Sequence, residues 1–373
     1  MTAESRFYHI VHTESSGGWG GQEIRILNEI REFVKLGFPV TLVCDAGSPI
    51  ALRAQQYGLT TVQLPMGKKT IKGLFALRRW IVQNDFDLIN THSSSDSWMV
   101  AVAMLMTLKT VPIIRTRHVS APVSTNRSTS WLYKKAAAHV VTTGERLRQT
   151  LIRDNGISPD NVTSVPTGID CNIFTPTKDV EAVRKALDLP LDKCIIGIVA
   201  TLRSWKGHSY LLDAFSQIDL SDSHLLVVGD GPQWDNINKQ IDRLGLREKV
   251  TLCGDQQDVV PWMQAMDIFT LPSYANEGVP QGLMQAMACG LPVISTDVGS
   301  IVEIIDDNYT GIIVEKQSAA ALAKAITALR QDNNLRQSIA ERALLFARQN
   351  CDISAMRDRM NSVFLTILNR NNR

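Results

Sequence analysis

The chain alternates short apolar runs with longer stretches whose apolar residues recur every three to four positions. Short apolar runs are typical of buried strands, and the longer spacing is typical of amphipathic helices. In the first half this pattern predicts one helix at 22–36 and strands at 7–12, 40–44, 88–92, 113–116, 140–143 and 162–166. Further helices are expected between these strands, and the alternation predicts a parallel, doubly wound α/β sheet.

A second alternating series follows the segment Thr167–Asp170. Its pattern predicts strands at 195–200, 225–228, 250–253, 268–271, 293–295 and 312–314, and closing helices at 318–330, 334–348 and 354–369. A chain of 373 residues exceeds the usual size of one core. We therefore expect domains at 1–170 and 171–353, a linker at 170–178, and a last helix, about 354–373, that packs back on the first domain.

Composition narrows the class of protein. Hydrophobic residues make up 44% and charged residues 20%, as in soluble globular proteins. The net charge of +2 excludes a broad nucleic-acid-binding field. Six scattered cysteines without a Cys-x-x-Cys pair predict a reduced, cytoplasmic protein without disulfides or a zinc site. The longest apolar run, 98–108, falls short of the roughly 20 residues that span a bilayer and predicts a buried helix instead.

The most informative stretch is 272–293, which follows a predicted strand. Pro280 suits the first position of a helix, which we expect over about 280–289. Free N–H groups and the dipole make a helix start an anion site. Because Glu277 precedes this start, it either handles a neutral or cationic partner beside the anion or caps the helix.

Other loops that follow strands also contain candidate residues, since ligands of such sheets sit at the carboxyl ends of the strands. The glycine-rich loop 17–21 allows positive φ and close approach of a phosphate or sugar, or it is a structural turn. Its spacing does not match a dinucleotide motif. Arg203 and Lys206 can neutralise a diphosphate, or they are ordinary surface charges. Residues 229–232 either contact a nucleotide or form only a turn, and the turn role is a sufficient explanation for that loop.

Two histidines follow predicted strands. His92 and His118 can hydrogen-bond a sugar hydroxyl or transfer a proton, or they are structural. A basic and aromatic segment lies earlier in the chain and predicts either a surface that rests on anionic lipid or a plain solvated helix face. Its residues are Lys68, Lys69, Lys72, Phe75, Arg78, Arg79 and Trp80.

Taken together, these motifs resemble the retaining glycosyltransferases of family 4, which have the GT-B fold. The resemblance covers essentially the whole chain. It is carried by 271–273, Glu277-Gly278, 286–293, the interdomain segment 165–170 and the glycine loop 20–23. It implies two doubly wound Rossmann-like domains that face a central cleft.

The resemblance also implies roles for single residues. Glu277 would contact the transferred sugar and stabilise positive charge at the reacting carbon. Lys206 and Arg203 would hold the departing diphosphate, although Thr201 stands where the family usually has arginine. His118 would lie near the donor sugar. The donor would bind Gly20, Gly21, Gly278, Val279, Pro280 and Gln285, the last of which replaces the second glutamate of the family, eight positions after Glu277.

The implied reaction is transfer of a hexosyl unit from a nucleoside-diphosphate sugar to a hydroxyl of a saccharide or lipid-linked saccharide, with retention of configuration. We expect neither a metal nor another cofactor, no nucleic-acid partner, and a role in cell-surface polysaccharide or lipopolysaccharide assembly. The expected location is cytoplasmic, with contact to the inner membrane face. Two alternatives stay open: a GT-B nucleotide-sugar epimerase and a non-catalytic nucleotide-sugar-binding subunit.

Overall fold

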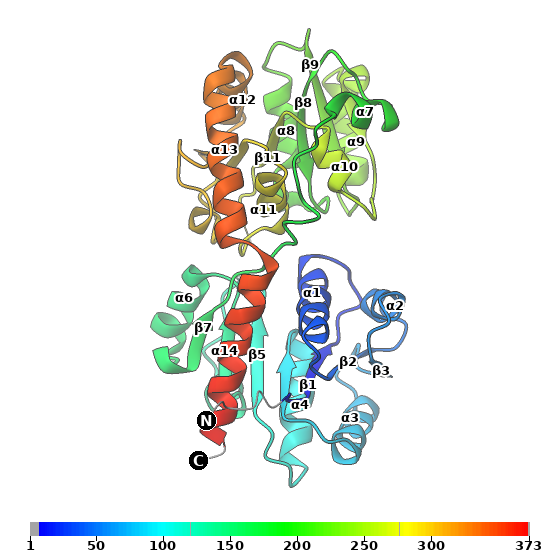
Figure 1. The fold of residues 1–373 in the computed structure, drawn as a ribbon, viewed down its shortest axis with the longest axis vertical. Helices are drawn as coiled ribbons and strands as arrows, with labels where there is room; N and C mark the ends of the chain where they lie inside the picture. Colours follow the sequence, from blue (N-terminus) through cyan, green and yellow to red (C-terminus); the bar gives the residue numbers. More distant parts are fainter. Residues whose placement is uncertain (1–6, 120, 276, 372–373) are drawn as a thin grey trace. The chain divides into compact units, whose positions relative to one another are not determined.

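The computed structural model describes residues 7–119, 121–275 and 277–371, with side chains up to residue 370. Contacts divide the chain into unit 1, which runs up to Gly168 and resumes at Ile353, and unit 2, which spans Ile169–Asp352. Asn276, inside the stretch 272–293, and residues 372–373 of the expected last helix lie outside the described residues. Figure 1 shows the ribbon with its labels.

Unit 1 contains a parallel sheet in the order β3-β2-β1-β4-β5-β6-β7. The strands are β1 (Ile10–Glu14), β2 (Val40–Asp45), β3 (Thr61–Leu64), β4 (Leu88–Thr91), β5 (Ile113–Arg117), β6 (His139–Thr142) and β7 (Val162–Ser164). The order reverses between β1 and β4, because the chain builds outward from β1 in both directions.

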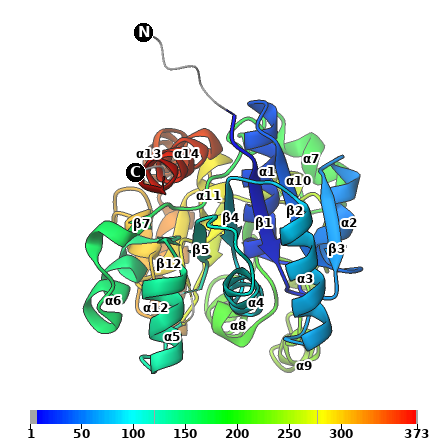
Figure 2. The same cartoon turned by 90° about the horizontal axis from the view of Figure 1, so that it is seen from below.

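Helices cover both faces of this sheet. They are α1 (Gly21–Lys35), α2 (Pro49–Gln56), α3 (Ile71–Gln83), α4 (Ser94–Leu105), α5 (Arg127–Trp131), the π-helix η1 (Leu132–Ala136), α6 (Glu145–Asn155), the short η2 (Pro159–Asn161) and α14 (Ile353–Asn371). Two core clusters show that α1, α2 and α14 pack on one face, whereas α3, α4, η1 and α6 pack on the other. Figure 2 shows α1 and α14 on one side of the sheet and α3 to α5 on the opposite side.

Unit 2 contains a second parallel sheet, in the order β10-β9-β8-β11-β12-β13. Its strands are β8 (Cys194–Val199), β9 (Ser223–Val228), β10 (Val250–Leu252), β11 (Ile268–Leu271), β12 (Val293–Thr296) and β13 (Ile312–Val314). Here the order reverses between β8 and β11. The helices are α7 (Val180–Ala186), η3 (Ser204–Lys206), α8 (His208–Phe215), α9 (Trp234–Arg243), η4 (Arg247–Lys249), α10 (Val260–Gln264), α11 (Gln281–Ala288), η5 (Ile301–Glu303), α12 (Ala319–Gln331) and α13 (Asn333–Asn350).

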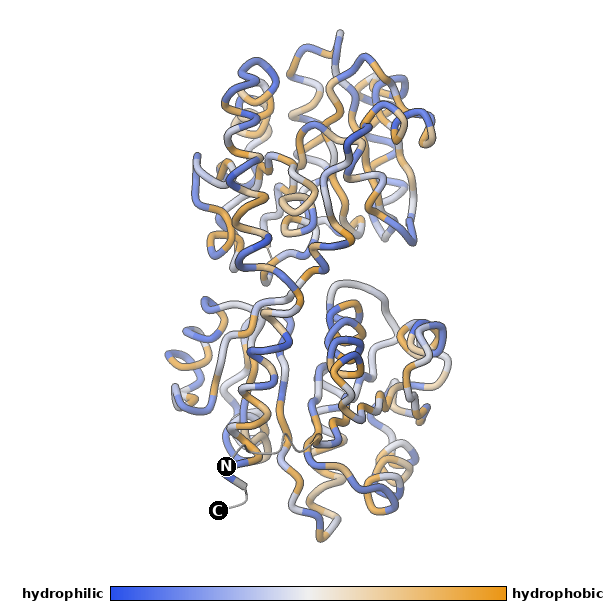
Figure 3. The backbone as a smooth tube through the Cα atoms, in the orientation of Figure 1, coloured by the Kyte–Doolittle hydropathy of each residue, from blue (hydrophilic) through white to orange (hydrophobic). Residues whose placement is uncertain are grey.

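Apolar strands explain why both sheets form. Most strand residues are fully buried, and Figure 3 shows hydrophobic residues along the strands of both units. Strands of this kind, buried on both faces, read as continuous apolar runs, so the sequence pattern located them within one to three residues. The exception is β3, which the pattern missed because this edge strand is only half-buried and lacks such a run.

Two expected helices differ from the structure in detail. Pro280 is the N-cap of α11, with φ −72° and ψ 124°, so the helix begins one residue later, at Gln281. The apolar run 98–108 is not a fully buried helix. The helix α4 ends at Leu105, whose side chain is 71% exposed, and Leu108 beyond it is 103% exposed.

Candidate active site

The two loops that follow β8 and β11 are bound together at the point where the strand order of unit 2 reverses. Such a point is where ligands of open α/β sheets bind. The N–H of Tyr274 donates to the carbonyl of Trp205 at 2.8 Å. Gly207, at φ +81°, comes so close to Pro272 that a Cβ on it would lie 2.1 Å from that carbonyl oxygen. Only glycine allows this approach, so the two loops form one rigid platform.

This platform places a cation and a carboxylate side by side. Lys206 Nζ lies 2.6 Å from Glu277 Oε1, and the same oxygen accepts a hydrogen bond from Ser273 Oγ at 2.6 Å. Glu277 is buried, and Lys206 is half-buried. The described partners of this carboxylate are therefore Lys206 and Ser273 rather than the start of α11, which favours charge handling over helix capping.

Residues that the sequence analysis missed hold Glu277 and Ser273 in place. Gly299, at φ +61°, packs so tightly that a Cβ on it would lie 2.0 Å from the carbonyl oxygen of Glu277. Thr296 Oγ1 donates to the carbonyl of Ser273, and Ser295 Oγ donates to the carbonyl of Leu271 at 2.7 Å. Ser295 and Thr296 carried a sequence signal, because they are polar residues at the carboxyl end of the buried strand β12.

The other predicted residues of unit 2 lie around this platform. Arg203 is exposed, and its Cζ lies 5.5 Å from the ring centroid of Trp205, so the guanidinium packs on an indole beside the loop that carries Lys206. Gln285 is half-buried on α11, and its side-chain amide has no hydrogen bond among the described residues. Neither residue contacts Glu277 in the described part of the structure.

Two backbone carbonyls near the start of α11 are hydrogen-bonded. The carbonyl of Gly278 accepts a hydrogen bond from Ser300 N–H at 3.3 Å, and the carbonyl of Pro280 accepts one from Met284 N–H at 3.4 Å. The side chain of Val279 is buried. Gly278, Val279 and Pro280 thus stand at the helix start, where their described contacts hold the backbone in place.

The loop 229–232 has a structural role. A Cβ on Gly229 would lie 2.1 Å from the carbonyl oxygen of Ala200, and Leu202 N–H donates to the carbonyl of Asp230 at 3.0 Å. This loop therefore supports the loop after β8 from behind, as the turn interpretation predicted.

In unit 1, three histidines meet at the reversal between β1 and β4. His118 Nε2 lies 2.9 Å from His92 Nδ1, and His92 Nε2 lies 2.9 Å from His12 Nδ1. Burial lowers the pKa of His12 to about 3. Burial first, and then neighbouring charges, hold the pKa of His92 and of His118 well below the usual value. All three rings are therefore neutral at physiological pH.

The sequence pattern indicated His92 and His118 as candidates but not His12. The signal was present, because His12 is a polar residue at an inward position of an apolar strand. Buried polar groups need partners, so such a residue predicts a polar network inside the sheet.

Two buried acids lie at the same edge of unit 1. Glu14 ends β1 and accepts hydrogen bonds from Ser16 N–H at 2.7 Å and from Gln22 Nε2. Asp96 accepts hydrogen bonds from Thr13 Oγ1 at 2.6 Å and from His92 N–H at 2.9 Å. Burial first, and then the charge of Asp96, raises the pKa of Glu14 to about 8.

The glycine-rich loop connects these acids to α1. Gly20 is the N-cap of α1, with φ 179°, and its carbonyl accepts a hydrogen bond from Ile24 N–H at 3.0 Å. The expected positive φ is wrong for Gly17, Gly18 and Gly20, none of which is left-handed. A Cβ on Gly17 would meet nothing within 4 Å, whereas one on Gly18 would lie 3.3 Å from Ser16 Oγ and one on Gly20 would lie 3.8 Å from Glu23 Oε2. Gly21 is the first residue of α1.

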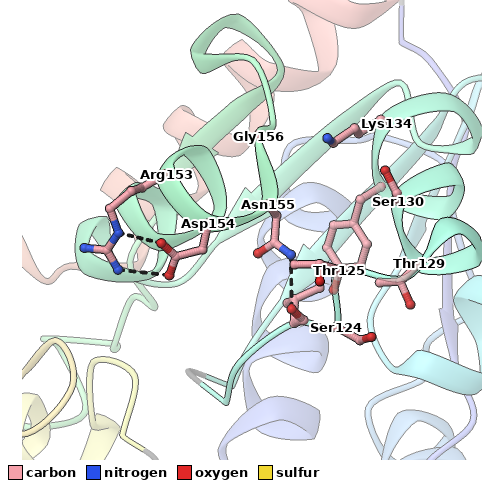
Figure 4. A pocket seen from close by; sticks show the side chains of 11 residues that line it. Ser124, Thr125, Thr129, Ser130, Lys134, Arg153, Asp154, Asn155 and Gly156 are labelled. Atoms are coloured by element: carbon pink, nitrogen blue, oxygen red, sulfur yellow. Dashed lines mark hydrogen bonds and ion pairs between the residues drawn. The ribbon is translucent and has the colours of Figure 1, made fainter.

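A separate pocket of about 380 Å³ lies in unit 1 between the loop after β5, α5 with η1, and the end of α6. Figure 4 shows its hydroxyl and amide lining, with Asn155 bonded to the loop and Arg153 bonded to Asp154. None of the predicted site residues lines it. Arg153 pairs with its neighbour Asp154, whereas no ion pair involves Lys134 among the described residues.

Among the residues that the structure describes, no group of three or more His, Cys, Asp or Glu side chains could hold a metal ion. None of the helices in the described ranges combines the length and apolarity that crossing a bilayer requires.

Known proteins match both units. A family model described as "Glycosyl transferases group 1" matches residues 179–345, and one described as "Glycosyltransferase Family 4" matches residues 19–173. The chain is 29% identical, over 90% of its length and 88% of the relative's, to a D-inositol 3-phosphate glycosyltransferase of Corynebacterium aurimucosum. It is 25% identical, over 72% of each chain, to an Escherichia coli UDP-Gal:alpha-D-GlcNAc-diphosphoundecaprenol alpha-1,3-galactosyltransferase. Among solved structures, Anabaena HepE in complex with UDP-glucose has a TM-score of 0.87 at 21% identity, over 96% of this chain and 100% of that one.

Two parallel-sheet Rossmann-like units of seven and six strands, with such structural neighbours, define the GT-B fold. The expected fold class is therefore confirmed. The family models and the relatives together support a glycosyltransferase of the family 4 type.

Proposed function

We propose that this protein transfers a hexosyl unit from a nucleoside-diphosphate sugar to a hydroxyl of a saccharide or lipid-linked saccharide, with retention of the anomeric configuration. The observation that carries the proposal is the 2.6 Å contact between Lys206 and Glu277 at the strand reversal of unit 2. A cation and a carboxylate held together there match the two charges that develop when a sugar leaves a diphosphate.

In this mechanism Lys206 stabilises the departing diphosphate. An ammonium group has three donors, so one can stay on Glu277 while the others bind phosphate oxygens. The start of α11 adds its dipole, and Arg203 adds a further positive charge from the rim. We propose that these groups replace a catalytic metal ion and that no other cofactor takes part.

Glu277 stabilises the positive charge that grows at the anomeric carbon, since sugar transfer passes through an oxocarbenium-like transition state. Ser273 and the packing of Gly299 keep this carboxylate in place. The acceptor attacks on the face that the diphosphate leaves, and a diphosphate oxygen takes the acceptor proton. No covalent glycosyl-enzyme is needed in this scheme.

The acceptor belongs to unit 1 in this proposal, and His118 serves the donor sugar from the same unit. The Escherichia coli relative, by its name, acts on a diphosphoundecaprenol-linked sugar, which supports a lipid-linked acceptor. Lipopolysaccharide or polysaccharide assembly at the inner face of a membrane is the matching role, with the protein in the cytoplasm.

The helix α3 supplies a surface for that membrane contact. Ile71, Phe75 and Val82 are exposed and recur at helical spacing, so they form one apolar stripe, and Ile71 is 75% exposed. Leu105 and Leu108 add to it from the end of α4, which packs against α3. The cations beside this stripe are Lys68, Lys69, Lys72 and Arg79. Arg78 lies on the stripe itself, between Phe75 and Val82, and donates to the carbonyl of Met106 at 2.9 Å. Trp80 of the expected basic and aromatic surface instead stacks on Phe86, with ring centroids 5.7 Å apart.

Thermal-shift measurements against UDP-, GDP- and ADP-sugars test the donor, because a ligand that binds only the folded state raises Tm. UDP-glucose comes first, since it is the ligand in the Anabaena structure. The stabilising donor is then incubated with the enzyme, with and without a lipid-linked saccharide. A glycosylated product with retained configuration supports the proposal. Epimerised donor without an acceptor favours the epimerase, and binding without any product favours a non-catalytic subunit.

Co-sedimentation with vesicles tests the membrane surface. Changing Phe75 and Leu108 to Ser should weaken binding to vesicles that contain anionic lipid, because both apolar and electrostatic contacts hold a surface helix. The matched control is Leu365→Ser, an exposed leucine on α14 across the sheet, which should bind as the wild type does. Equal vesicle binding by the wild type, the Phe75 and Leu108 variant and the Leu365 variant would contradict the proposal that α3 and the end of α4 contact the membrane.

A further inference from the structure

The three histidines of unit 1 lie on neighbouring strands or just after them, each one closer to the carboxyl edge of the sheet than the one before. His12 pairs with Asn90, and Asn90 pairs with Ile114. His92 is two residues beyond Asn90 and His118 is four beyond Ile114, so all three rings project from the same face. Each step crosses one strand and moves two residues toward the edge.

Their contacts leave two possible arrangements of protons. A neutral imidazole has one N–H and one lone pair. Each of the two N···N contacts of 2.9 Å needs one proton between its nitrogens. Consequently all three rings carry their proton on Nε2, or all three carry it on Nδ1.

A buried carboxylate stands at the inner end of this chain. Glu29 Oε1 lies 4.0 Å from His12 Nε2, and both residues are fully buried. The other carboxylate oxygen lies 3.9 Å from Arg25 Nε, so a fixed positive charge helps to keep Glu29 ionised. A carboxylate favours an N–H over a lone pair on the nitrogen that faces it.

A second path orients the same carboxylate. Thr116 Oγ1 donates to Asn90 Oδ1 at 2.8 Å, which turns the amide nitrogen of Asn90 toward Glu29 Oε1 at 3.4 Å. Glu29 Oε1 thus accepts a hydrogen bond from Asn90 and presents acceptor character, 4.0 Å away, to His12 Nε2. This arrangement selects the state in which His12 carries its proton on Nε2.

We propose that Glu29 is a positioning residue that acts through His12 and His92 to hold His118 in the Nε2–H tautomer. In that tautomer Nδ1 of His118, which has no partner among the described residues, is a hydrogen-bond acceptor at the edge of the sheet. The inference rests on the proposed function, in which this nitrogen accepts a hydrogen bond from a hydroxyl of the transferred sugar. No proton is transferred, because the chain only fixes which nitrogen carries the lone pair.

The tautomers can be read directly in the donor-free protein. Ring ¹⁵N signals at pH 8 distinguish N–H from lone-pair nitrogens, and at that pH Glu29, whose pKa burial raises to about 7, is mainly ionised. We expect His12, His92 and His118 to be neutral and protonated on Nε2. A proton on Nδ1 of His118, or an imidazolium there, would overturn the proposal.

Glu29→Gln then tests the selection, because a neutral amide can donate to His12 as well as accept from it. We expect His118 to populate both tautomers in this variant. The matched control is His139→Gln, a buried histidine of the same sheet that contacts Thr163 Oγ1 at 2.9 Å instead of the chain. It should leave the His118 signals unchanged. If Glu29→Gln does not fold, His12→Asn interrupts the same chain, and the wild-type tautomers still decide the question.

Kinetics separate this inference from the proposed function. Glu29→Gln should lower kcat roughly tenfold and change the donor KM little, as expected for a residue that orients a contacting group. The His139→Gln control should keep both constants. A wild-type protein without any transfer would contradict the proposed function, whereas a pure Nε2–H signal of His118 in Glu29→Gln would contradict the positioning role alone.

Discussion

The points where the strand order reverses carry different kinds of polar groups in the two units. In unit 2, two adjacent loops bring one ammonium and one carboxylate within 2.6 Å, so the site presents opposite charges. In unit 1, three strands bring together neutral imidazoles and buried acids whose pKa values are shifted by burial. Charge suits a leaving diphosphate, whereas neutral donors and acceptors suit sugar hydroxyls. The same topology can therefore supply either type of site, depending on which residues end the strands.

The largest expected effect concerns the charge pair of unit 2. Glu277→Gln keeps the shape of the side chain and removes its charge, so kcat should fall on the order of 10²- to 10³-fold. Steady-state transfer from the stabilising donor measures this. The control Glu181→Gln breaks an exposed ion pair with Lys185 and should change kcat less than about twofold. Near-normal turnover of Glu277→Gln would show that the charge pair at the strand reversal of unit 2 is not needed for transfer.

A second effect concerns the rigidity of the unit 2 platform. Gly207→Ala adds a Cβ that would lie 2.1 Å from the carbonyl oxygen of Pro272. We expect the free energy of unfolding to fall by about 1–2 kcal/mol because of the left-handed backbone and by a further 1–3 kcal/mol because of the clash. Urea unfolding of the wild type and the variant measures this difference.

Gly245→Ala is the matched control for that substitution. Gly245 has φ +67° and nothing within 4 Å of an added Cβ, so only the backbone cost applies. If both variants lost the same stability, the close approach of the two loops would not matter.

The third prediction concerns the buried acids of unit 1. The pKa of Glu14 is raised from 4.5 to about 8, so the folded state holds a proton that the unfolded state releases in this range. The stability that this residue contributes therefore falls as the pH rises through that window, by up to about 1.4 kcal/mol per pH unit. Glu14→Gln should remove this part of the slope between pH 6.5 and 8 in urea unfolding. An unchanged slope would show that Glu14 is ionised in the folded protein.

The smallest effect is expected for Arg203, the exposed arginine on the loop after β8. Arg203→Ala removes a guanidinium that packs over Trp205 rather than on Glu277. We expect the donor KM to rise a few-fold, by about 1 kcal/mol or less, with kcat nearly unchanged, since an exposed charge is screened by solvent. If kcat fell as much as in Glu277→Gln, Arg203 would be as important for the reaction as the pair Lys206 and Glu277.

The sequence supported prediction of the unit 2 site far better than that of unit 1. Glu277 and Lys206 each follow a recognisable strand and belong to compact motifs, so their meeting could be expected from topology. His12 and Glu29 instead lie within a strand and a helix, not in a loop that follows a strand. Their partners are 80 and 61 residues away in sequence, and no local signal connects them.

By itself the sequence determined the two-sheet architecture, the order of every strand except β3, and the loops that follow those strands, because these follow from local periodicity and turn residues. Only the tertiary structure decided that Gly207 and Gly299 clamp the unit 2 loops and that Glu29 ends a chain of three histidines. The physical reason is distance: steric contacts and hydrogen bonds act over a few ångströms, and strand pairing brings distant residues within that range.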